Sequence, residues 1–452
     1  MMTDPRASAR QELTATGEGG SAGRLGAMLR RLNCIEETGS LADVLPKPGD
    51  AGTSVAAAVA EILEQVRRGG DAAVAELTAR FDPEPPATAR VAPEEVTAAL
   101  DRIDGGLRHA LEVAWSRVLA YHQTEGSLTP EFNEGGVRVR HLRVPVDRVG
   151  MYAPGGLARY PSSVLMAAAP ARAAGVAELV LCVPPGPGGR LDDATLAAAA
   201  LAGVTEVYAI GGAQAIAAMA YGTETIRPVD VIVGPGNAYV AEAKRQVSGV
   251  VGVASAFAGP SEVAVVADAT TPPLLAAIDL MVQAEHGPDG FAWLITWDLH
   301  LADAVEEELV RLVAAAPRRA ELEATFASGG YCCLVRDAAQ AMEVVNVVAP
   351  EHLELLVEDF EPLLAQVRNA GAIFCGPSAP ASFGDYLAGP NHILPTNRTA
   401  RFASALRTED FFKYLHAVEV SPTALATLGP EVVRLARAEG LEAHAQSIEL
   451  RR

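Results

Sequence analysis

The alternation of two kinds of segment over residues 162–247 restricts the fold of this chain more than any other feature of its sequence. Residues 178–184, 206–211 and 229–234 are predominantly apolar, and the stretches between them carry apolar residues at helical spacing. Strands that are apolar on both faces are typical of parallel sheets covered by helices on each side. The region is therefore predicted to form a doubly wound α/β sheet.

The same alternation resumes after residue 261. Strands are predicted at 262–268, 291–298, 330–337 and 370–376, with helical patterns between them. Two further helical patterns, which precede the first sheet, cover 53–80 and 93–123. The chain is therefore predicted to contain a second parallel α/β sheet.

A stretch with strand periodicity separates the first helical patterns from the first sheet. Val and Arg alternate from Val137 onward, and the stretch ends in a Pro-Gly-Gly turn. Alternation with a period of two indicates strands, and Pro and Gly mark turns. We expect residues 150–156 to be the crossing between two domains.

Charge and composition exclude two classes of partner. The chain has 36 Lys and Arg against 56 Asp and Glu, and its formal charge of -20 would repel a phosphate backbone. The richest apolar stretch, 164–184, is interrupted by Arg172 and Glu178, so no membrane span is expected. We therefore expect neither nucleic acid nor a membrane as a partner.

The five cysteines form no Cys-x-x-Cys pair and lie mostly in or beside apolar segments, which fits a reducing cytoplasm. Residues 1–24 have no hydrophobic core of a signal peptide and are expected to be a disordered lead. We therefore expect a cytoplasmic protein.

Two predicted strand-to-helix turns are rich in glycine. Residues 211–214 read Gly-Gly-Ala-Gln and residues 234–237 read Gly-Pro-Gly-Asn. Ligands bind at the carboxyl ends of strands in such sheets, and helix N-termini favour phosphate, so a nucleotide site is plausible. Neither turn matches Gly-x-Gly-x-x-Gly, and the alternative is an ordinary tight turn.

Four places in the chain offer the donor groups that metal binding or proton transfer requires. They are Gln283 with His286, Glu351 with His352, Asp385 with His392, and Glu439 with His444. A glutamine oxygen and a neutral imidazole can each donate a lone pair to a cation, and a carboxylate beside an imidazole suits proton transfer. Each place is equally consistent with ordinary polar surface, so the residues alone leave the choice open.

Local geometry decides whether the two side chains can reach one site in two of these pairs. Gln283 and His286 are three residues apart, on one face of a helix that a Gly-Pro pair must end. Glu351 and His352 would point in opposite directions on an extended chain, so they share a site only if Pro350 begins a turn or a helix.

Two further segments carry opposite expectations. Residues 376–400 form a long loop rich in Pro and Gly, which a compact domain would keep only for function. Glu354 and Glu358, by contrast, are expected to be solvated surface residues.

The chain resembles the histidinol dehydrogenase family from about Leu25 to its C-terminus. Eight motifs occur in the order of that family: VGMYAPGG, GGAQAIAA, GPGNAYV, AGPSE, QAEHG, APEHLE, SFGDYLAGPNHILPT and EGLEAH. Two departures are Ala254-Ser255 in place of the usual Ile-Asp pair, and Tyr414 in a predicted helix where a basic residue is frequent.

The resemblance assigns roles to residues in these motifs. It implies that one zinc ion per chain is bound by Gln283, His286, Asp385 and His444. It implies that Glu351 and His352 are the proton acceptors. Substrate contacts are implied for the zinc ligands together with His352, Ser261, His392 and Glu439, and NAD contacts for Tyr152, Gln214 and Asn237.

The implied fold is α/β, with two incomplete Rossmann-like parallel-sheet domains, one inserted in the other. Residues 25–150 and 261–403 would form one domain with most of the zinc and catalytic residues. Residues 151–260 would form the inserted NAD-binding domain, and 404–452 a small helical segment that reaches the partner subunit of a homodimer with shared active sites.

The C-terminal pair needs a break in its helix to meet one substrate. Glu439 and His444 would be separated by about 140° on a continuous helix. Gly440 permits a left-handed turn that would end the helix directly after Glu439. The alternative is a frayed tail with a solvated His444.

The implied reaction is the oxidation of L-histidinol through L-histidinaldehyde to L-histidine, with two NAD molecules reduced in turn. The alternatives are a related zinc and NAD dehydrogenase of another small alcohol or polyol, a metal-dependent hydrolase, and a non-catalytic nucleotide-binding protein. The hydrolase leaves Tyr152, Gln214 and Asn237 without a role, and a binding protein does not need an aligned Glu-His pair.

Overall fold

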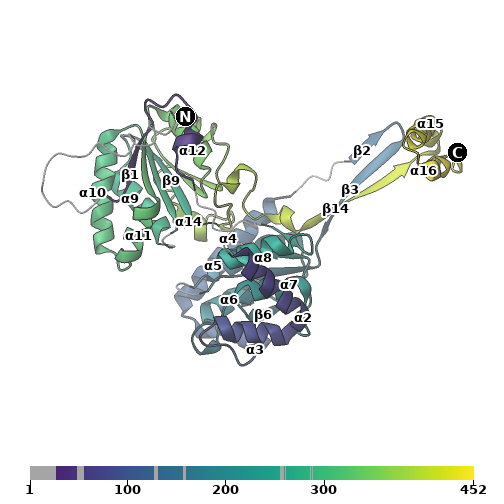
Figure 1. The fold of residues 1–452 in the computed structure, drawn as a ribbon, viewed down its shortest axis with the longest axis horizontal. Helices are drawn as coiled ribbons and strands as arrows, with labels where there is room; N and C mark the ends of the chain where they lie inside the picture. Colours follow the sequence, from purple (N-terminus) through teal and green to yellow (C-terminus); the bar gives the residue numbers. More distant parts are fainter. Residues whose placement is uncertain are drawn as a thin grey trace, which may run out of the picture.

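The computed structural model describes residues 27–47, 55–126, 131–155, 159–254, 259, 261–285, 287 and 289–452. Over these residues the chain forms two α/β domains and a projecting arm, which carries the C-terminus (Figure 1). Within the described part of the chain, no helix has both the length and the apolar character to cross a bilayer.

The first domain is built on a six-stranded sheet in which every pairing is parallel. Its strands, in spatial order, are β1 (Arg30–Asn33), β11 (Gly330–Leu334), β10 (Phe291–Thr296), β9 (Glu262–Ala267), β12 (His352–Leu356) and β13 (Ala372–Cys375). One face packs on α9 (Pro273–Ala284), α10 (Leu299–Ala315) and α11 (Arg319–Gly329). The other packs on α1 (Leu41–Val44), α12 (Ala338–Val348) and α13 (Glu361–Leu364). The central strands β9, β10 and β11 are largely apolar, as expected for strands covered on both faces, whereas the edge strand β1 is mostly exposed.

The second domain is built on a five-stranded parallel sheet. Its spatial order is β6 (Glu206–Ala209), β5 (Glu178–Val183), β4 (Arg148–Tyr152), β7 (Val231–Val233) and β8 (Gly252–Val253). One face is covered by α3 (Pro93–Arg102), α4 (Gly105–Thr124), α5 (Pro161–Ala174) and α6 (Asp193–Leu201). The other is covered by α2 (Ala56–Phe81), α7 (Gly212–Tyr221) and α8 (Ala238–Val247). The predicted pair of parallel sheets is confirmed.

The structure places two segments differently from the expected domain division. Residues 56–124 form α2 to α4 and pack on the five-stranded sheet, not on the six-stranded one. Residues 150–156 were expected to be a crossing, but β4 lies at the centre of that same sheet. Helical periodicity defines which face of a helix is apolar, and it cannot show which of two sheets will cover that face.

The arm consists of antiparallel strands that carry a helical hairpin at their end. β3 (Val137–Pro145) pairs with β2 (Glu131–Glu134) and with β14 (Phe412–Val420). α15 (Pro422–Ala438) and α16 (Glu442–Glu449) follow β14 and lie far from both domains (Figure 1). The prediction of a helix at Tyr414 is therefore wrong. The segment is a strand, because it pairs with β3 along its whole length.

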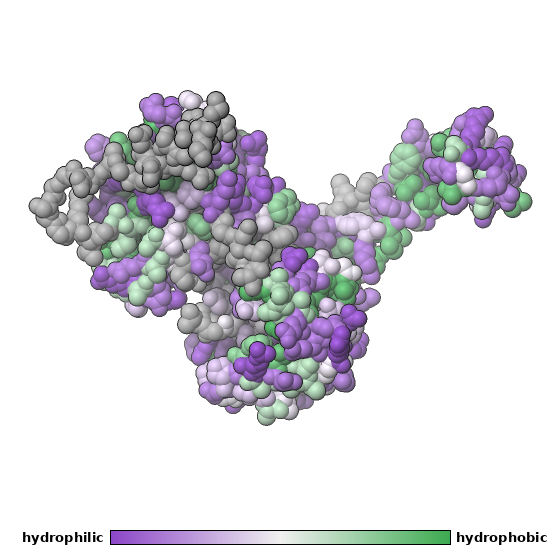
Figure 2. Space-filling model, in the orientation of Figure 1, coloured by the Kyte–Doolittle hydropathy of each residue, from purple (hydrophilic) through white to green (hydrophobic). Residues whose placement is uncertain are grey.

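The arm exposes many apolar side chains, which Figure 2 shows as green atoms along it. Val418 is 60%, Leu435 65% and Leu450 87% exposed. The remaining core of the hairpin is small and comprises Val433, Ala436 and Ala445. Exposed apolar surface of this kind is typical of a contact with another molecule.

Candidate active site

Polar side chains gather at the amino-terminal edge of the six-stranded sheet, where the parallel strands begin. Glu262 is the first residue of β9 and His352 the first of β12, with Glu351 directly before it. Gln283 lies in the last turn of α9, which returns from the opposite edge of the sheet. Ala349 adopts a left-handed conformation (φ 50°) after α12, and this turn leads the chain back into the sheet.

Glu351 and His352, at the start of β12, lie in one cluster, although neighbours on an extended chain would point in opposite directions. Glu351 Oε2 accepts hydrogen bonds from the backbone N–H of Glu262 at 3.0 Å and from Gln283 Nε2 at 3.3 Å. His352 Nδ1 lies 3.3 Å from the carbonyl oxygen of Glu262 and 3.6 Å from Glu351 Oε2. Both of these neighbours are acceptors, whereas Gln283 Nε2, a donor, lies 3.3 Å from the same nitrogen. The two acceptors outnumber the donor, so we assign a ring proton to Nδ1.

The other ring nitrogen of His352, Nε2, faces the long loop of residues 376–400 that was predicted to be functional. Asp385 lies in α14 (Ala381–Tyr386), and its Oδ1 is 3.4 Å from His352 Nε2. His392 Nδ1 donates to the backbone carbonyl of Asp385 at 2.9 Å, so its Nε2 is left as an acceptor for the Ser163 hydroxyl at 3.3 Å. Ser163 belongs to α5 of the second domain, and the site therefore lies where the two domains meet.

Burial and charge act in opposite directions on these groups. Burial alone would lower the pKa of His352, but the carboxylates of Glu351 and Asp385 outweigh it and raise the pKa to about 10. Burial lowers the pKa of His392, which keeps that ring neutral. Burial, reinforced by the charge of Glu351, raises the pKa of Glu262 to about 8.

The donors at this edge suit a cation. Gln283 Oε1 is buried and has no hydrogen-bond partner among the described residues, while its Nε2 is held by Glu351. The C-terminal ends of α9 and α12 also lie at this edge, and the partial negative charge of a helix C-terminus favours a cation. Over the described residues, no group of three or more His, Cys, Asp or Glu is placed to hold a metal.

The remaining expected ligands divide into two cases. His286 lies outside the described residues. Glu439 and His444 are exposed at the end of the arm, so a single chain does not bring them to its own site (Figure 1). Gly440 has the expected left-handed conformation (φ 76°), and it ends α15 directly after Glu439, which is the C-cap residue. Ser261 is described and leads into β9.

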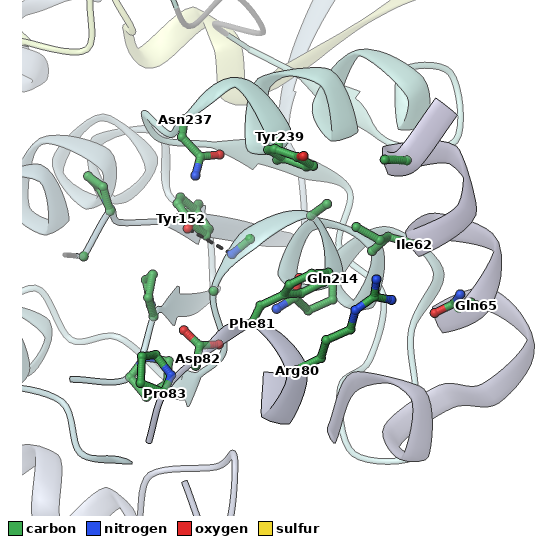
Figure 3. Close-up of a pocket in the computed structure, with 18 of the residues that line it drawn as sticks. Ile62, Gln65, Arg80, Phe81, Asp82, Pro83, Tyr152, Gln214, Asn237 and Tyr239 are labelled. Atoms are coloured by element: carbon green, nitrogen blue, oxygen red, sulfur yellow. Dashed lines mark hydrogen bonds between the residues drawn. The ribbon is translucent and has the colours of Figure 1, made fainter. Parts of the chain in front are cut away.

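A second candidate site is a cavity of about 660 Å³ at the carboxyl-terminal edge of the five-stranded sheet. Tyr152, Gln214 and Asn237 all line it, as Figure 3 shows. Tyr152 Oη accepts a hydrogen bond from Gly212 N at 3.1 Å, and burial raises the pKa of this phenol to about 12. Asn237 caps α8 through a hydrogen bond from Val240 N at 3.1 Å.

Two helix N-termini and three glycines, Gly155, Gly211 and Gly212, border this cavity. α7 and α8 both begin at its wall, and free N–H groups at a helix N-terminus favour a phosphate. A Cβ at Gly234 (φ 108°) would lie 2.0 Å from the carbonyl oxygen of Tyr152, so only glycine fits there. The predicted glycine-rich turns therefore lie beside a cavity large enough for part of a dinucleotide.

Sequence reasoning missed several residues of both sites. Phe81 and Asp82, which end α2, line the cavity but belong to no glycine-rich turn. Glu262 stands in the AGPSE motif, where only the serine was considered. Glu354 was expected at the surface and is fully buried, whereas Glu358 is exposed as expected. The usable signal for Glu354 was its place in an apolar strand.

Comparison with known proteins gives a consistent result. The family model described as histidinol dehydrogenase matches residues 46–452. A histidinol dehydrogenase of Gluconobacter oxydans is 48% identical over 413 residues, 91% of this chain and 96% of that protein. One of Thermosynechococcus vestitus is 48% identical over 398 residues, 87% of this chain and 92% of that protein. The crystal structure of histidinol dehydrogenase from Elizabethkingia anophelis matches with a TM-score of 0.89 and 31% identity, covering 95% of this chain and 99% of that one.

Proposed function

This chain belongs to the histidinol dehydrogenase family of oxidoreductases, and from this premise we propose that it oxidises L-histidinol through L-histidinaldehyde to L-histidine while two NAD molecules are reduced in turn. The observation that supports the proposal best is the cluster at the amino-terminal edge of the six-stranded sheet. There, His352 lies between two carboxylates, in reach of the amide of Gln283. This arrangement can hold a small polar substrate and remove a proton from it.

The chain's own donors fit the zinc ion that the proposal includes. Gln283 and Asp385 would hold it together with His286 and the partner subunit's His444. When bound, zinc would supply a template that orients the imidazole and amino nitrogens of histidinol. Gln283 Oε1 is the buried oxygen that lacks a partner among the described residues, which supports its assignment as a ligand.

Glu351 and His352 divide the proton transfers. His352 would accept the hydroxyl proton of histidinol as a hydride leaves the adjacent carbon for the nicotinamide. It must be neutral to do so, and a zinc ion on Asp385 would favour the neutral ring by offsetting the charge of that carboxylate. Glu351 would accept a proton from the water that hydrates the aldehyde before the second oxidation. The hydrogen bond from the backbone N–H of Glu262 fixes the orientation of the Glu351 carboxylate. The aldehyde stays bound between the steps, so it cannot react elsewhere.

The arm supports a site that is shared between two subunits. Glu439 and His444 lie on it, away from the cluster, and the arm exposes apolar side chains that a second copy would cover. Two copies related by a two-fold axis would each supply the residues that the other lacks.

Mixed dimers test the shared site. His352→Ala and His444→Ala chains should each be inactive as homodimers. The hybrid should regain about half of the wild-type activity per dimer, because one of its two sites is complete. A hybrid as inactive as its parents, with dimer formation confirmed, would show that the arm acts within its own subunit.

The proposed reaction is tested by its stoichiometry. Purified protein with zinc, NAD and L-histidinol should form two NADH per histidinol consumed, measured by absorbance and by amino-acid analysis of the histidine formed. One NADH per histidinol, with the aldehyde as product, would contradict the second oxidation. Absence of NADH formation would contradict a dehydrogenase of this substrate.

A further inference from the structure

A buried carboxyl group without a role in the proposed chemistry lies directly beneath the site. Glu354 is in β12, two residues after His352, so both side chains leave the same face of the sheet. It is fully buried, and its Oε1 accepts a hydrogen bond from the backbone N–H of Ala381 at 2.8 Å. Burying a carboxyl group is costly, so such a group persists where its partners need it.

The second partner of this carboxyl group is another carboxyl group. Asp279, on α9, is 9% exposed, and its carboxyl group lies close enough to that of Glu354 for the two to share a proton. Glu354 Oε2 is buried and accepts from no N–H or O–H donor of the described residues, so a carboxyl group can occupy this place. Two carboxyl groups can hydrogen-bond only if one of them carries a proton. Burial, and then the charge of Asp279, raises the pKa of Glu354 to about 9, in agreement with a proton held there at neutral pH.

The pair connects three of the elements that carry site residues in this domain. Asp279 is one helical turn before Gln283 on α9, and Ala381 begins α14, one turn before Asp385. Glu354 itself belongs to the strand of His352. We propose that Glu354 and Asp279 are positioning residues, whose hydrogen-bonded carboxyl pair fixes Gln283, His352 and Asp385 relative to one another.

α14 depends on this support more than the other two elements do. It has only six residues, and Pro380 at its N-cap provides no side-chain hydrogen bond to its first turn. Short helices are marginal without tertiary contacts. The acceptor from Glu354 therefore replaces a local cap and ties Asp385 to the sheet.

The experiment measures Zn2+ affinity by competition with a chromogenic chelator, and kcat and KM for histidinol. It rests on the proposed zinc site, and the wild-type protein tests that part: a wild-type protein that binds no Zn2+ contradicts the proposed function, not the positioning role. In Glu354→Leu the support of α14 is lost, and we expect the Zn2+ Kd to rise roughly 10- to 100-fold, with a fall in kcat. Glu354→Gln keeps an acceptor for Ala381 and a donor for Asp279, so it should stay within about 3-fold of wild type.

Thr271→Val is the matched control for stability. Thr271 is buried, and its hydroxyl hydrogen-bonds to the carbonyl of Leu356 in the same strand. The variant should lower Tm and leave the Zn2+ Kd unchanged, since the lost hydrogen bond lies at the carboxyl-terminal end of β12, away from the site. If Glu354→Leu behaves like this control, with lower Tm but wild-type Zn2+ affinity and kcat, the positioning role is wrong.

Asp279→Ala keeps the proposal testable if Glu354→Leu does not fold. It removes one partner from the less buried side and leaves the hydrogen bond to Ala381 in place. We expect a Zn2+ Kd about 10-fold above wild type. A wild-type Kd in Asp279→Ala, together with a Glu354→Gln variant that loses Zn2+, would contradict the pair.

Discussion

The two parallel sheets of this protein are alike in construction, but their candidate sites lie at opposite edges. The cavity of the five-stranded sheet is at the carboxyl-terminal edge, where α7 and α8 begin. The polar cluster of the six-stranded sheet is at the amino-terminal edge, where α9 and α12 end. Helices therefore present N–H groups to the cavity and carbonyl groups to the polar cluster.

This difference decides what each edge can bind. Helix N-termini offer a partial positive charge and backbone donors, which suit the phosphates of the proposed dinucleotide. Helix C-termini offer a partial negative charge and no donors, which suits a cation, but all specific groups must then come from side chains. The polar cluster accordingly consists of the side chains of Gln283, Glu351, His352 and Asp385, whereas glycines shape the cavity.

The largest effect should follow a change at the amino-terminal edge. Asp385→Ala removes a proposed zinc ligand and a neighbour of His352, so kcat should fall by about 1,000-fold or more. The Kd for NAD, measured by calorimetry, should stay within 3-fold of wild type by an order-of-magnitude argument from distance. A parallel loss of NAD binding would show that the two edges do not function separately.

His286→Ala should have the next largest effect on turnover. If this residue is a zinc ligand, the purified variant should contain less than about a tenth of the zinc of the wild type, measured by atomic emission, and lose turnover. A variant that keeps both its metal and its activity would remove the histidine from the proposed ligand set.

A glycine of the carboxyl-terminal edge should give the reverse pattern. In Gly234→Ala the new Cβ would meet the carbonyl oxygen of Tyr152, so the turn must shift. KM for NAD should rise on the order of 10- to 100-fold, from a strain of about 1–3 kcal/mol, while zinc content is retained.

Gly249→Ala is the control for Gly234→Ala. Its φ of 100° is similar to the 108° of Gly234, but a Cβ there meets nothing within 4 Å. It should cost stability through backbone strain alone and leave KM for NAD unchanged. Equal effects of the two substitutions on KM would mean that the clash at the cavity is irrelevant.

The smallest effect on binding is expected for Tyr152→Phe. The change removes the acceptor of the hydrogen bond from Gly212 N and little else. One such bond contributes about 0.5–1.5 kcal/mol, so KM for NAD should rise roughly 2- to 10-fold. Steady-state kinetics at saturating histidinol measure this, and an unchanged KM would exclude a role of the phenol in the cavity.

The amino-terminal edge should also leave a signature in the pH dependence of stability. Glu262 stays protonated up to about pH 8 in the folded protein, whereas its ordinary pKa is 4.5. Between pH 4.5 and about pH 8 the unfolded chain binds fewer protons at Glu262 than the folded protein does. The contribution of Glu262 to the free energy of unfolding therefore falls as pH rises. Glu262→Gln should flatten the curve over this window in urea titrations. Curves of equal slope for both proteins would contradict the buried neutral carboxyl group.

The sequence predicted those features that depend on local pattern. Gly440 ends α15 as expected, because a left-handed residue directly after the C-cap is a local requirement. The parallel sheets follow from strands that are apolar on both faces. The packing of 56–124 and the burial of Glu354 were missed, since both depend on which elements meet across the fold. The apolar residues around Glu354 are a local sign of burial, but the sequence does not show the partner, Asp279, that a buried carboxyl group needs.

The pairings of the arm also constrain the order in which this protein can fold during synthesis. The five-stranded sheet and its covering helices are complete once residue 253 has been made. β3, by contrast, pairs with β14, whose residues 412–420 come almost at the end of the chain. Throughout most of translation β3 therefore keeps an unpaired edge, which is the feature of a sheet that most readily joins another strand. The five-stranded sheet can therefore form beside the ribosome. The arm, and the part of that domain's core supplied by Leu406 and Phe411, can form only when synthesis is nearly finished.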